Sequence, residues 1–580
     1  MSNLSIKELR TKNYYRWLEG SLAIATLSFF GFVVLLSFVN PYLITILIFC
    51  YSFIWLLKVT LICLHIIYGY KQLRRWQRVD WLELLKAFEK SKESGIGELQ
   101  KVKNFSKIKE WQNKIEQDIK AFQTETNNIY HKPYNIYQFP IFAVYNESCE
   151  VLTRSLQSVY ESGYPLSKIC IFITQEGRMG EEHNLNFRKN IEQLTWVNTA
   201  NISVLDLDTV FCSHHEQLDY NYPDFELFSI KEDKLNIVFV QHPEGLVGEI
   251  KGKASNESYA GRQISLFIKS KKIPASLSIV TSLDADSSVG KYFFHMLAYR
   301  FCATPNRARA GFQPIPAYSN NYFETHFWPR VVAANTTLWQ FAQSSLQDEA
   351  KFFANYCVPL NVLQEINFWQ TDIIAEDALC FTKAYCHYNG NFQVIPFYGV
   401  FNGDAVEADT YLETIENQYK QIQRWAWGGV ECFPFIIQNL FFEEKGKLIP
   451  LKKRIKFSLD EFLNHFFWST TQLIFSVGFF LPRLLGGSGF NTLPLVITIA
   501  GFGVFFTWIS SILVVIFSYI TLVFITNERG HSISFGTLFK ITYQAVFSSL
   551  IYVLLGIPAI DSQIRGLRGN YLGYWVTPKK

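Results

Sequence analysis

The chain has 580 residues, a formal net charge of +4, and 49% hydrophobic and 17% aromatic residues. So small a charge on so long a chain argues against a nucleic-acid-binding protein, and the length allows two or more domains. The ten cysteines include no CxxC pair, so we expect reduced, structural thiols. Cys380, Cys386 and His387 fall on one helical stretch, and we interpret them as packing residues rather than metal ligands.

The first predicted elements are two membrane-spanning helices. Residues 20–39 form an apolar run long enough to cross a bilayer, and residues 42–64 form a second run after Asn40-Pro41. We expect a helical hairpin in which Lys58 reaches the headgroups near the end of the second helix. Basic residues flank the hairpin on both sides, which predicts cytoplasmic flanks. They are Lys7, Arg10, Lys12 and Arg16 before it, and Lys71, Arg74, Arg75 and Arg78 after it.

Residues 79–135 are polar and helix-prone, and we expect a solvated helical connector without chemistry. From Phe139 onward, short apolar strands alternate with amphipathic helices, which is the pattern of an α/β domain. Ligands of such sheets bind beyond the carboxyl ends of the strands, so polar residues directly after a strand are candidate site residues. The predicted strands cover residues 140–145, 169–174, 237–241 and 277–283, and the candidates are Asn146-Glu147, Glu176 and Asp284.

Two acidic pairs follow apolar runs. Asp284-Ala285-Asp286 comes after the predicted strand 277–283, where two carboxylates can hold one hard divalent cation, Mg²⁺ or Mn²⁺. Asp206-Leu207-Asp208 has the same spacing after a shorter run, which shows that the pattern also arises by chance. The position of Asp284 and Asp286 among the other motifs favours this first pair as the metal ligands.

Two later motifs lie on predicted helices. Glu376-Asp377 begins a helix over residues 378–388, where acidic residues suit the helix dipole, which would lower the pKa of Asp377. Gln421, Arg424 and Trp425 share one face of a helix over residues 415–427, which we expect to end at Gly428-Gly429. A helix lying on a membrane surface would also use Arg and Trp in this way.

The C-terminal region returns to the membrane. Apolar runs cover residues 462–484, 492–526 and 537–560, and a turn at residues 508–511 would divide the middle run into two spans. Basic residues at both ends of the region favour cytoplasmic flanks, so we expect four crossings here and six in all.

In this order, the motifs resemble those of the membrane-embedded family 2 glycosyltransferases, the class that includes cellulose, chitin and hyaluronan synthases. Tyr145-Asn146-Glu147 is similar to the end of that family's first strand, and Lys253-Ala254-Ser255-Asn256 to its Gly-Lys-Ala-x-x-Asn segment, with the asparagine one position early. The resemblance covers about residues 20–70 and 136–580. It implies an α/β fold, with a cytoplasmic GT-A-type nucleotide-sugar domain inserted between α-helical transmembrane segments.

The resemblance also implies the domain boundaries. A tail and transmembrane hairpin would occupy residues 1–78, the connector 79–135, the transferase domain 136–456, and the C-terminal transmembrane region with its tail 457–580.

By resemblance, six residues would bind the nucleotide-sugar, and the first acidic pair would bind the metal. The nucleotide-sugar residues are Tyr145, Glu147, Glu176, Lys253, Asn256 and Asp284; the metal ligands are Asp284 and Asp286. Family members most often have aspartate where this chain has Glu176, a difference that bears on base preference. The cation would offset the charge on the departing nucleoside diphosphate.

Asp377 matches the catalytic base of the family's Thr-Glu-Asp motif, with Ala375 in place of the threonine. Arginine can bind a diphosphate in bidentate fashion, and an indole can stack on a sugar ring. The residues that would bind the acceptor and the diphosphate are Glu376, Gln421, Arg424 and Trp425. Tyr574-Trp575-Val576-Thr577-Pro578 resembles a C-terminal aromatic-Thr segment of related transferases, to which we assign no function.

These features predict an inverting hexosyltransferase of the plasma (inner) membrane that extends a polysaccharide, with possible export across that membrane. Transfer of one sugar to a lipid-linked acceptor is an alternative. A polyprenyl-phosphate sugar transferase would not need the Gln-x-x-Arg-Trp helix. A transporter would carry more ionisable residues in its spans, and an inactive scaffold would have lost one of the three carboxylates. The expected partners are a nucleotide-sugar, a glycan or lipid-linked acceptor and the membrane, with no nucleic acid.

Overall fold

The computed structural model describes residues 5–124, 132–202, 225, 227–346, 350–478, 480–491, 493–528, 535–573 and 575. The chain divides into two compact units. Unit 1 comprises residues 1–70, 317–345 and 404–580, and unit 2 comprises residues 71–316 and 346–403.

Unit 2 is built on one mixed sheet, which has nine strands within the described part of the chain, in the order β3-β4-β2-β1-β5-β8-β7-β9-β6. Strands β3, β4, β2, β1 and β5 are parallel, β8 is antiparallel to both β5 and β7, and β6 is antiparallel to β9. The strands are β1 Tyr137–Val144, β2 Cys170–Glu176, β3 Val197–Ile202, β4 Leu235–His242, β5 Ser278–Asp284, β6 Ser288–Val289, β7 Ala310–Pro316, β8 Tyr356–Pro359 and β9 Gln393–Asn402.

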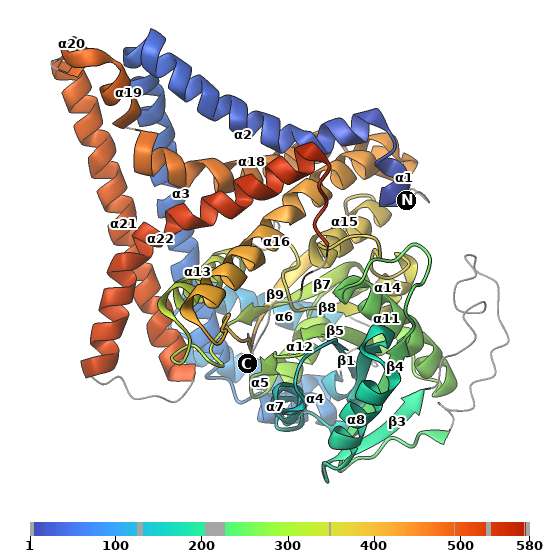
Figure 1. Ribbon diagram of the computed structural model, residues 1–580. Coiled ribbons are helices and arrows are strands. Elements are labelled where there is room, and N and C mark those ends of the chain that lie inside the picture. Colours follow the sequence, from blue (N-terminus) through green and yellow to red (C-terminus); the bar gives the residue numbers. More distant parts are fainter. Residues whose placement is uncertain are drawn as a thin grey trace. The chain divides into compact units, whose positions relative to one another are not determined.

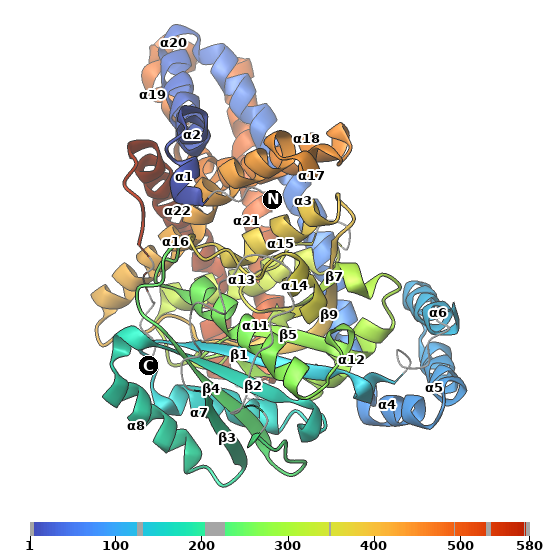
Figure 2. The same cartoon turned by 90° about the vertical axis from the view of Figure 1, so that its right-hand side faces the viewer.

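The parallel strands are buried almost throughout, as expected when helices cover both faces of a sheet. Helix α11 packs on β1, β2 and β4, and Figure 2 shows it on the opposite side of these strands from α7. The strands predicted at residues 140–145, 169–174, 237–241 and 277–283 are confirmed as β1, β2, β4 and β5. The helices of unit 2 are α4 Trp81–Lys90, α5 Lys92–Phe105, α6 Lys109–Thr124, α7 Cys149–Tyr160, α8 Glu181–Glu192, α11 Lys253–Ser270, α12 Phe293–Cys302, α14 Leu360–Glu365 and α15 Glu376–His387.

The connector forms three helices, α4 to α6, as expected, but it is not wholly solvated. Leu85, Phe88 and Phe122 are buried, and the rings of Phe88 and Phe122 lie 4.4 Å apart. The apolar residues recur at helical spacing and give these helices a packed inner face. Cys380 and Cys386 are buried as well, as predicted for packing residues.

Unit 1 is helical in its described residues. In Figure 1, α2 and α3 meet at one end, next to α19 and α20, and diverge from there. The helices are α1 Ile6–Leu9, α2 Asn13–Val39, α3 Pro41–Trp76 (whose last turns lie in unit 2), α13 Phe327–Gln343, α16 Tyr411–Ile437, α17 Glu444–Lys447, α18 Leu451–Leu473, α19 Phe480–Leu485, α20 Gly487–Asn491, α21 Pro494–Glu528 and α22 Phe535–Arg568.

Within the described residues, three helices are long and apolar enough to cross a membrane. They are Asn13–Val39, Pro41–Trp76 and the Val496–Phe517 part of α21.

The turn predicted at residues 508–511 is wrong, because α21 runs unbroken from Pro494 to Glu528. The segment Trp508-Ile509-Ser510-Ser511 contains no glycine or proline. In an apolar run, a continuous helix is the conformation that satisfies every backbone hydrogen bond.

The end predicted for the Gln-x-x-Arg-Trp helix is also wrong, because α16 continues through Gly428-Gly429 to Ile437. A Cβ atom at Gly429 would overlap the ring of His465 on α18. Glycine here permits two helices to approach closely and does not end the helix. Through such packing, residues 404–456 group with α2, α18 and α22 in unit 1, whereas the sequence placed them with the transferase domain.

Candidate active site

The predicted site residues of unit 2 gather at one edge of its sheet. Ala143 of β1 pairs with Asp284 of β5, and Val144 pairs with Gln175 of β2, one residue before Glu176. Because these strands are parallel and in register, their carboxyl ends lie side by side. The edge at which α/β sheets bind their ligands therefore carries the predicted residues.

Lys253, in the first turn of α11, stands at the centre of this edge. Its Nζ atom lies 2.8 Å from Oδ1 of Asp284, 3.6 Å from Oε1 of Glu376 and 3.7 Å from Oε1 of Glu257. It also donates a hydrogen bond of 3.0 Å to the carbonyl oxygen of Ala354. One ammonium group thus links residues from α11, β5 and the start of α15.

The electrostatics of this cluster keep Lys253 charged. Burial lowers the pKa of Lys253, but the carboxylates of Asp284, Glu257 and Glu376 outweigh burial and raise it well above its ordinary value. Burial likewise raises the pKa of Glu257 and of Glu376, against the opposing effect of Lys253. The ammonium group is therefore a fixed positive charge among carboxyl groups that protonate readily.

Glu257 was missed in the sequence. Its side chain is fully buried, and it accepts a short hydrogen bond from the hydroxyl of Ser282 on β5. It lies four residues after Lys253 on the same helix, so the spacing that brings helical side chains together could have identified it.

Asp377 lies in the first turn of α15, where its carboxylate accepts two backbone hydrogen bonds. The donors are the N–H groups of Ala354, at 3.0 Å, and of Ala378, at 2.7 Å. The predicted lowering of its pKa is wrong: burial raises the pKa, although both N–H groups act in the opposite direction. A carboxylate with a raised pKa is a better proton acceptor than one with an ordinary pKa.

A second group of predicted residues surrounds Glu176. Its Oε1 atom accepts a hydrogen bond of 2.9 Å from Asn256, and its carboxylate forms an ion pair with Arg178. The Arg178 guanidinium lies 3.6 Å from the centre of the Tyr145 ring, and Glu147 accepts a 2.8 Å hydrogen bond from the Tyr145 N–H. Arg178, which the sequence did not single out, joins the ends of β1 and β2.

The two residues predicted to hold a metal differ in exposure. The Asp284 side chain is 38% exposed, whereas Asp286 is buried. Asn355 fixes the loop between them: its Oδ1 atom accepts a 2.9 Å hydrogen bond from the Asp284 N–H, and its amide donates one of 2.6 Å to Ser287.

No group of three or more His, Cys, Asp or Glu side chains arranged for a metal occurs in the part of the chain that the structure describes. Two carboxylates suit a hard cation whose remaining oxygen ligands come from a bound molecule. The donor set therefore fits Mg²⁺ or Mn²⁺. The alternative pair, Asp206 and Asp208, lies outside the described residues.

Within unit 1, the side chains of the Gln-x-x-Arg-Trp motif differ in their contacts. Trp425 is partly buried against an apolar cluster formed by Trp328, Val332 and Ile422. Arg424 donates a hydrogen bond of 3.3 Å to the carbonyl oxygen of Trp575, in the C-terminal segment. The Gln421 side chain accepts one of 2.9 Å from Gln418, one turn earlier on α16.

The match to a family model indicates one enzyme class. Residues 279–527 match the family model described as glycosyl transferase family group 2, a stretch that includes Asp284, Asp377 and the Gln-x-x-Arg-Trp motif. On this match, the protein is a glycosyltransferase. No curated protein matches the chain.

Three solved structures are similar to the chain at low identity. The mannosyltransferase PcManGT from Pyrobaculum calidifontis, in complex with GDP-Man and Mn²⁺, is 13% identical, with 75% of this chain and 88% of that chain covered and a TM-score of 0.35. TarS 1–349 from S. aureus, in complex with UDP-GlcNAc, is 12% identical, with coverages of 72% and 91% and a TM-score of 0.30. GalNAc-T7 with UDP, GalNAc and Mn²⁺ is 11% identical, with coverages of 59% and 57% and a TM-score of 0.27. Likenesses this distant carry no argument about substrate.

The family match, together with the mixed sheet of unit 2 and the apolar helices near both ends of the chain, confirms the predicted fold class. The protein has a GT-A-type α/β domain and candidate transmembrane helices.

Proposed function

We propose that the protein transfers a hexose, with inversion, from a nucleoside-diphosphate sugar to a growing polysaccharide at the plasma (inner) membrane. The observation that carries this proposal is the pair of carboxyl side chains, Asp284 and Glu376, that meets Lys253 at the carboxyl edge of the sheet. Both carboxyl residues lie within the stretch that matches the glycosyltransferase family. The basic residues flanking the apolar helices support a cytoplasmic transferase domain and an acceptor held at the membrane.

In this proposal, Asp377 is the base. It takes the proton of the acceptor hydroxyl while that oxygen forms a bond to the anomeric carbon. The bond from that carbon to the diphosphate breaks, and the nucleoside diphosphate leaves with the electron pair. One displacement by one base inverts the anomeric configuration. The raised pKa of Asp377 supports this role, and its hydrogen bonds to Ala354 and Ala378 hold the carboxylate in one orientation.

Asp284 and Asp286 would hold Mg²⁺ or Mn²⁺, which when bound offsets negative charge on the departing diphosphate. Lys253 contributes a fixed positive charge at the same edge. We assign the nucleotide to the group around Glu176, with Tyr145, Glu147 and Asn256. We assign the acceptor and the diphosphate to Glu376, Gln421, Arg424 and Trp425.

The direct test is the release of nucleoside diphosphate by the full-length protein in detergent, across a panel of nucleotide-sugars supplied with Mg²⁺ or Mn²⁺ and membrane lipid. We expect one sugar donor to support release that depends on the metal. If no donor supports release above that of an Asp377→Asn variant, the protein is not acting as this transferase.

A further inference from the structure

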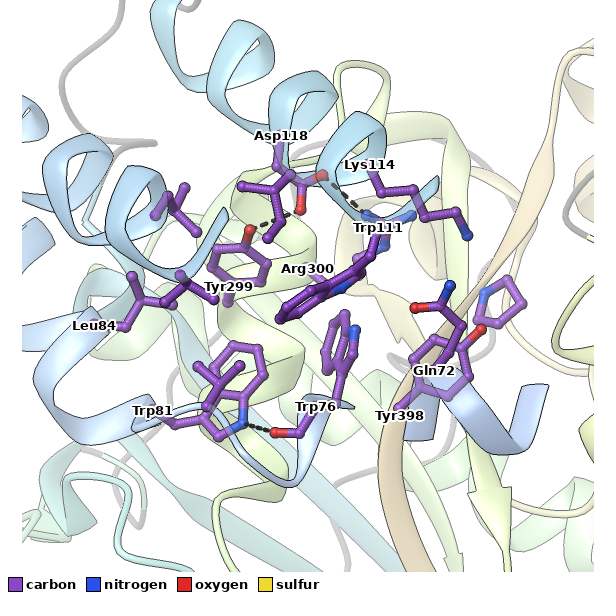
Figure 3. Close-up of a pocket in the computed structure, with 15 residues that line it drawn as sticks. Gln72, Trp76, Trp81, Leu84, Trp111, Lys114, Asp118, Tyr299, Arg300 and Tyr398 are labelled. Carbon is purple, nitrogen blue, oxygen red and sulfur yellow. Dashed lines mark hydrogen bonds and ion pairs between the residues drawn. The ribbon is translucent and has the colours of Figure 1, made fainter. Parts of the chain in front are cut away.

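Unit 2 contains a cavity of about 40 Å³ whose lining includes none of the predicted transferase site residues. Figure 3 shows its walls, which come from the last turns of α3, from the connector helices, and from α12 and β9. Its aromatic residues are Trp76, Trp81, Trp111, Tyr299 and Tyr398, and its polar residues are Gln72, Lys114, Asp118 and Arg300. None of these residues has a role in the transfer reaction proposed above.

Gln72 is the feature that points to a ligand. Its side chain is 1% exposed, and neither its Nε2 nor its Oε1 atom has a hydrogen-bond partner within the described residues. Figure 3 shows the amide beside Tyr398, on the side of the cavity away from Trp81. A buried amide without partners is unfavourable, so the site suits a ligand that both donates and accepts hydrogen bonds there.

Asp118 and its neighbours supply a second polar side. The Asp118 carboxylate accepts hydrogen bonds from the Tyr299 hydroxyl, at 2.6 Å, and from Arg300, at 3.2 Å. The Nε atom of Arg300 is buried and has no partner among the residues described. Groups with hydrogen-bonding capacity therefore face the cavity from Gln72 and from Arg300, with aromatic rings between them.

The orientation of the rings limits the kind of ligand. Trp76 lies 4.9 Å from Trp81 with the planes tilted by 41°, and its ring meets those of Tyr398 and Tyr299 edge-on, at 62° and 79°. In the described chain, these rings form no parallel pair that would sandwich a flat base. A sugar ring needs one aromatic surface for its apolar face and polar partners for its hydroxyls, each of which both donates and accepts.

The size of the cavity limits the part of a ligand that it can enclose. The enclosed space holds about three water-sized groups, which is enough for the hydroxylated edge of one ring.

We propose that this cavity binds a monosaccharide unit, either as a free sugar or as the end of a glycan, at a site separate from the transfer reaction. Gln72 binds the hydroxyls, and Trp111 packs against the ring. The proposal rests on the lining of the cavity alone, so its test measures binding rather than transfer.

The experiment is saturation-transfer NMR and calorimetry on the full-length protein with glucose, N-acetylglucosamine, mannose and galactose, and with the tetrasaccharides of the first two. We expect saturable binding of at least one sugar that Gln72→Leu and Trp111→Leu each weaken at least tenfold. A preference for the monosaccharide would indicate a free sugar, and a preference for the tetrasaccharide a glycan end. Gln112→Leu is the matched control, because Gln112 lies on the same connector helix α6 as Trp111 but does not line the cavity and bonds to Ser106.

Two further measurements separate this site from the transfer site and from a folding defect. Asp286→Ala should leave sugar binding unchanged. Gln72→Leu should raise the melting temperature of the sugar-free protein, since it removes a buried amide without partners. The proposal is overturned if no sugar binds saturably, if the Gln72 and Trp111 variants bind as the unmodified protein does, if Asp286→Ala abolishes binding, or if only a nucleoside monophosphate binds in a Gln72-dependent manner.

Discussion

The Lys253 ammonium and the Asp284 carboxylate form an ion pair of 2.8 Å at the carboxyl end of β5. Lys253 is buried, whereas the Asp284 side chain is 38% exposed. Of this pair, the carboxylate is therefore the group that a cation and a diphosphate can reach from solvent. This geometry sets the first prediction.

Asp286→Ala should abolish turnover and weaken nucleotide binding in the presence of Mn²⁺ or Mg²⁺, because it removes one of two carboxylate ligands. Asp206→Ala should do neither. Calorimetric titration of the nucleotide with and without metal measures both effects. The opposite result, a loss of binding with Asp206→Ala alone, would move the metal site to the other acidic pair.

Asp377→Asn should lower transfer by a factor on the order of 10² to 10⁴ while donor affinity persists. The substitution keeps the shape of the side chain but removes the proton acceptor. Asp372→Asn is the control, since Asp372 lies five residues earlier and bonds to Gln370. Near-normal transfer by the Asp377 variant would leave this residue the role of stabilising the start of α15.

Glu257→Gln should raise the melting temperature at neutral pH, because burial raises the pKa of Glu257 to about 7, so its charged form is more favourable in the unfolded chain than in the folded chain. The amide still accepts the hydrogen bond from Ser282, so the change reports the buried charge. Thermal unfolding in detergent, followed by circular dichroism, measures the change. Glu98→Gln, which breaks a surface pair with Lys101, should have no measurable effect; equal melting temperatures for the two variants would contradict the role of Glu257.

His295 should make the protein less stable in mild acid. Its ring is fully buried among Tyr134, Tyr164 and Tyr292, and burial lowers its pKa from 6.5 to about 4. Between pH 6.5 and 4, the unfolded chain binds a proton that the folded chain does not, so stability falls as the pH decreases, by about 3 kcal/mol in total.

His295→Phe should remove this pH dependence, and His183→Gln, at an exposed position, should not. The test is to record melting temperatures from pH 7.5 to 4 for the unmodified protein and the two variants. Parallel curves for His295→Phe and the unmodified protein would show that another group causes the loss.

The sequence predicts an element correctly where its local pattern of apolar and polar residues matches its position in the packed fold. An apolar run followed by Asp284 is both a strand and a strand end, so β5 and its acidic residues could be predicted. Glu257 could not be found from chemistry alone, because a glutamate on a helix usually faces water. Only its spacing from Lys253 indicated the buried pair.

Helix ends were harder to predict, because glycine has more than one function. Gly428-Gly429 has the composition of a helix end, yet Gly429 allows α16 to pack against His465. In the connector, the charged residues made the packed face hard to recognise. One side of each helix is polar, and the other carries apolar residues that line the cavity, such as Trp81, Leu99 and Ile115.

The most direct test of the account is the length of the product. With radiolabelled donor, the unmodified protein should give a ladder of glycan lengths, because an acceptor end held after each transfer is extended again. Trp425→Ala should leave donor hydrolysis measurable but remove the ladder. The variant loses the stacking of the acceptor sugar on the indole, which is worth roughly 1–3 kcal/mol by analogy with bases on aromatic side chains.

Trp468→Ala is the matched control, because Trp468 packs on the same apolar cluster and has no predicted contact with sugar; this variant should keep the ladder. A single labelled sugar on a lipid, at every donor concentration, would contradict the account and assign the protein to single-sugar transfer.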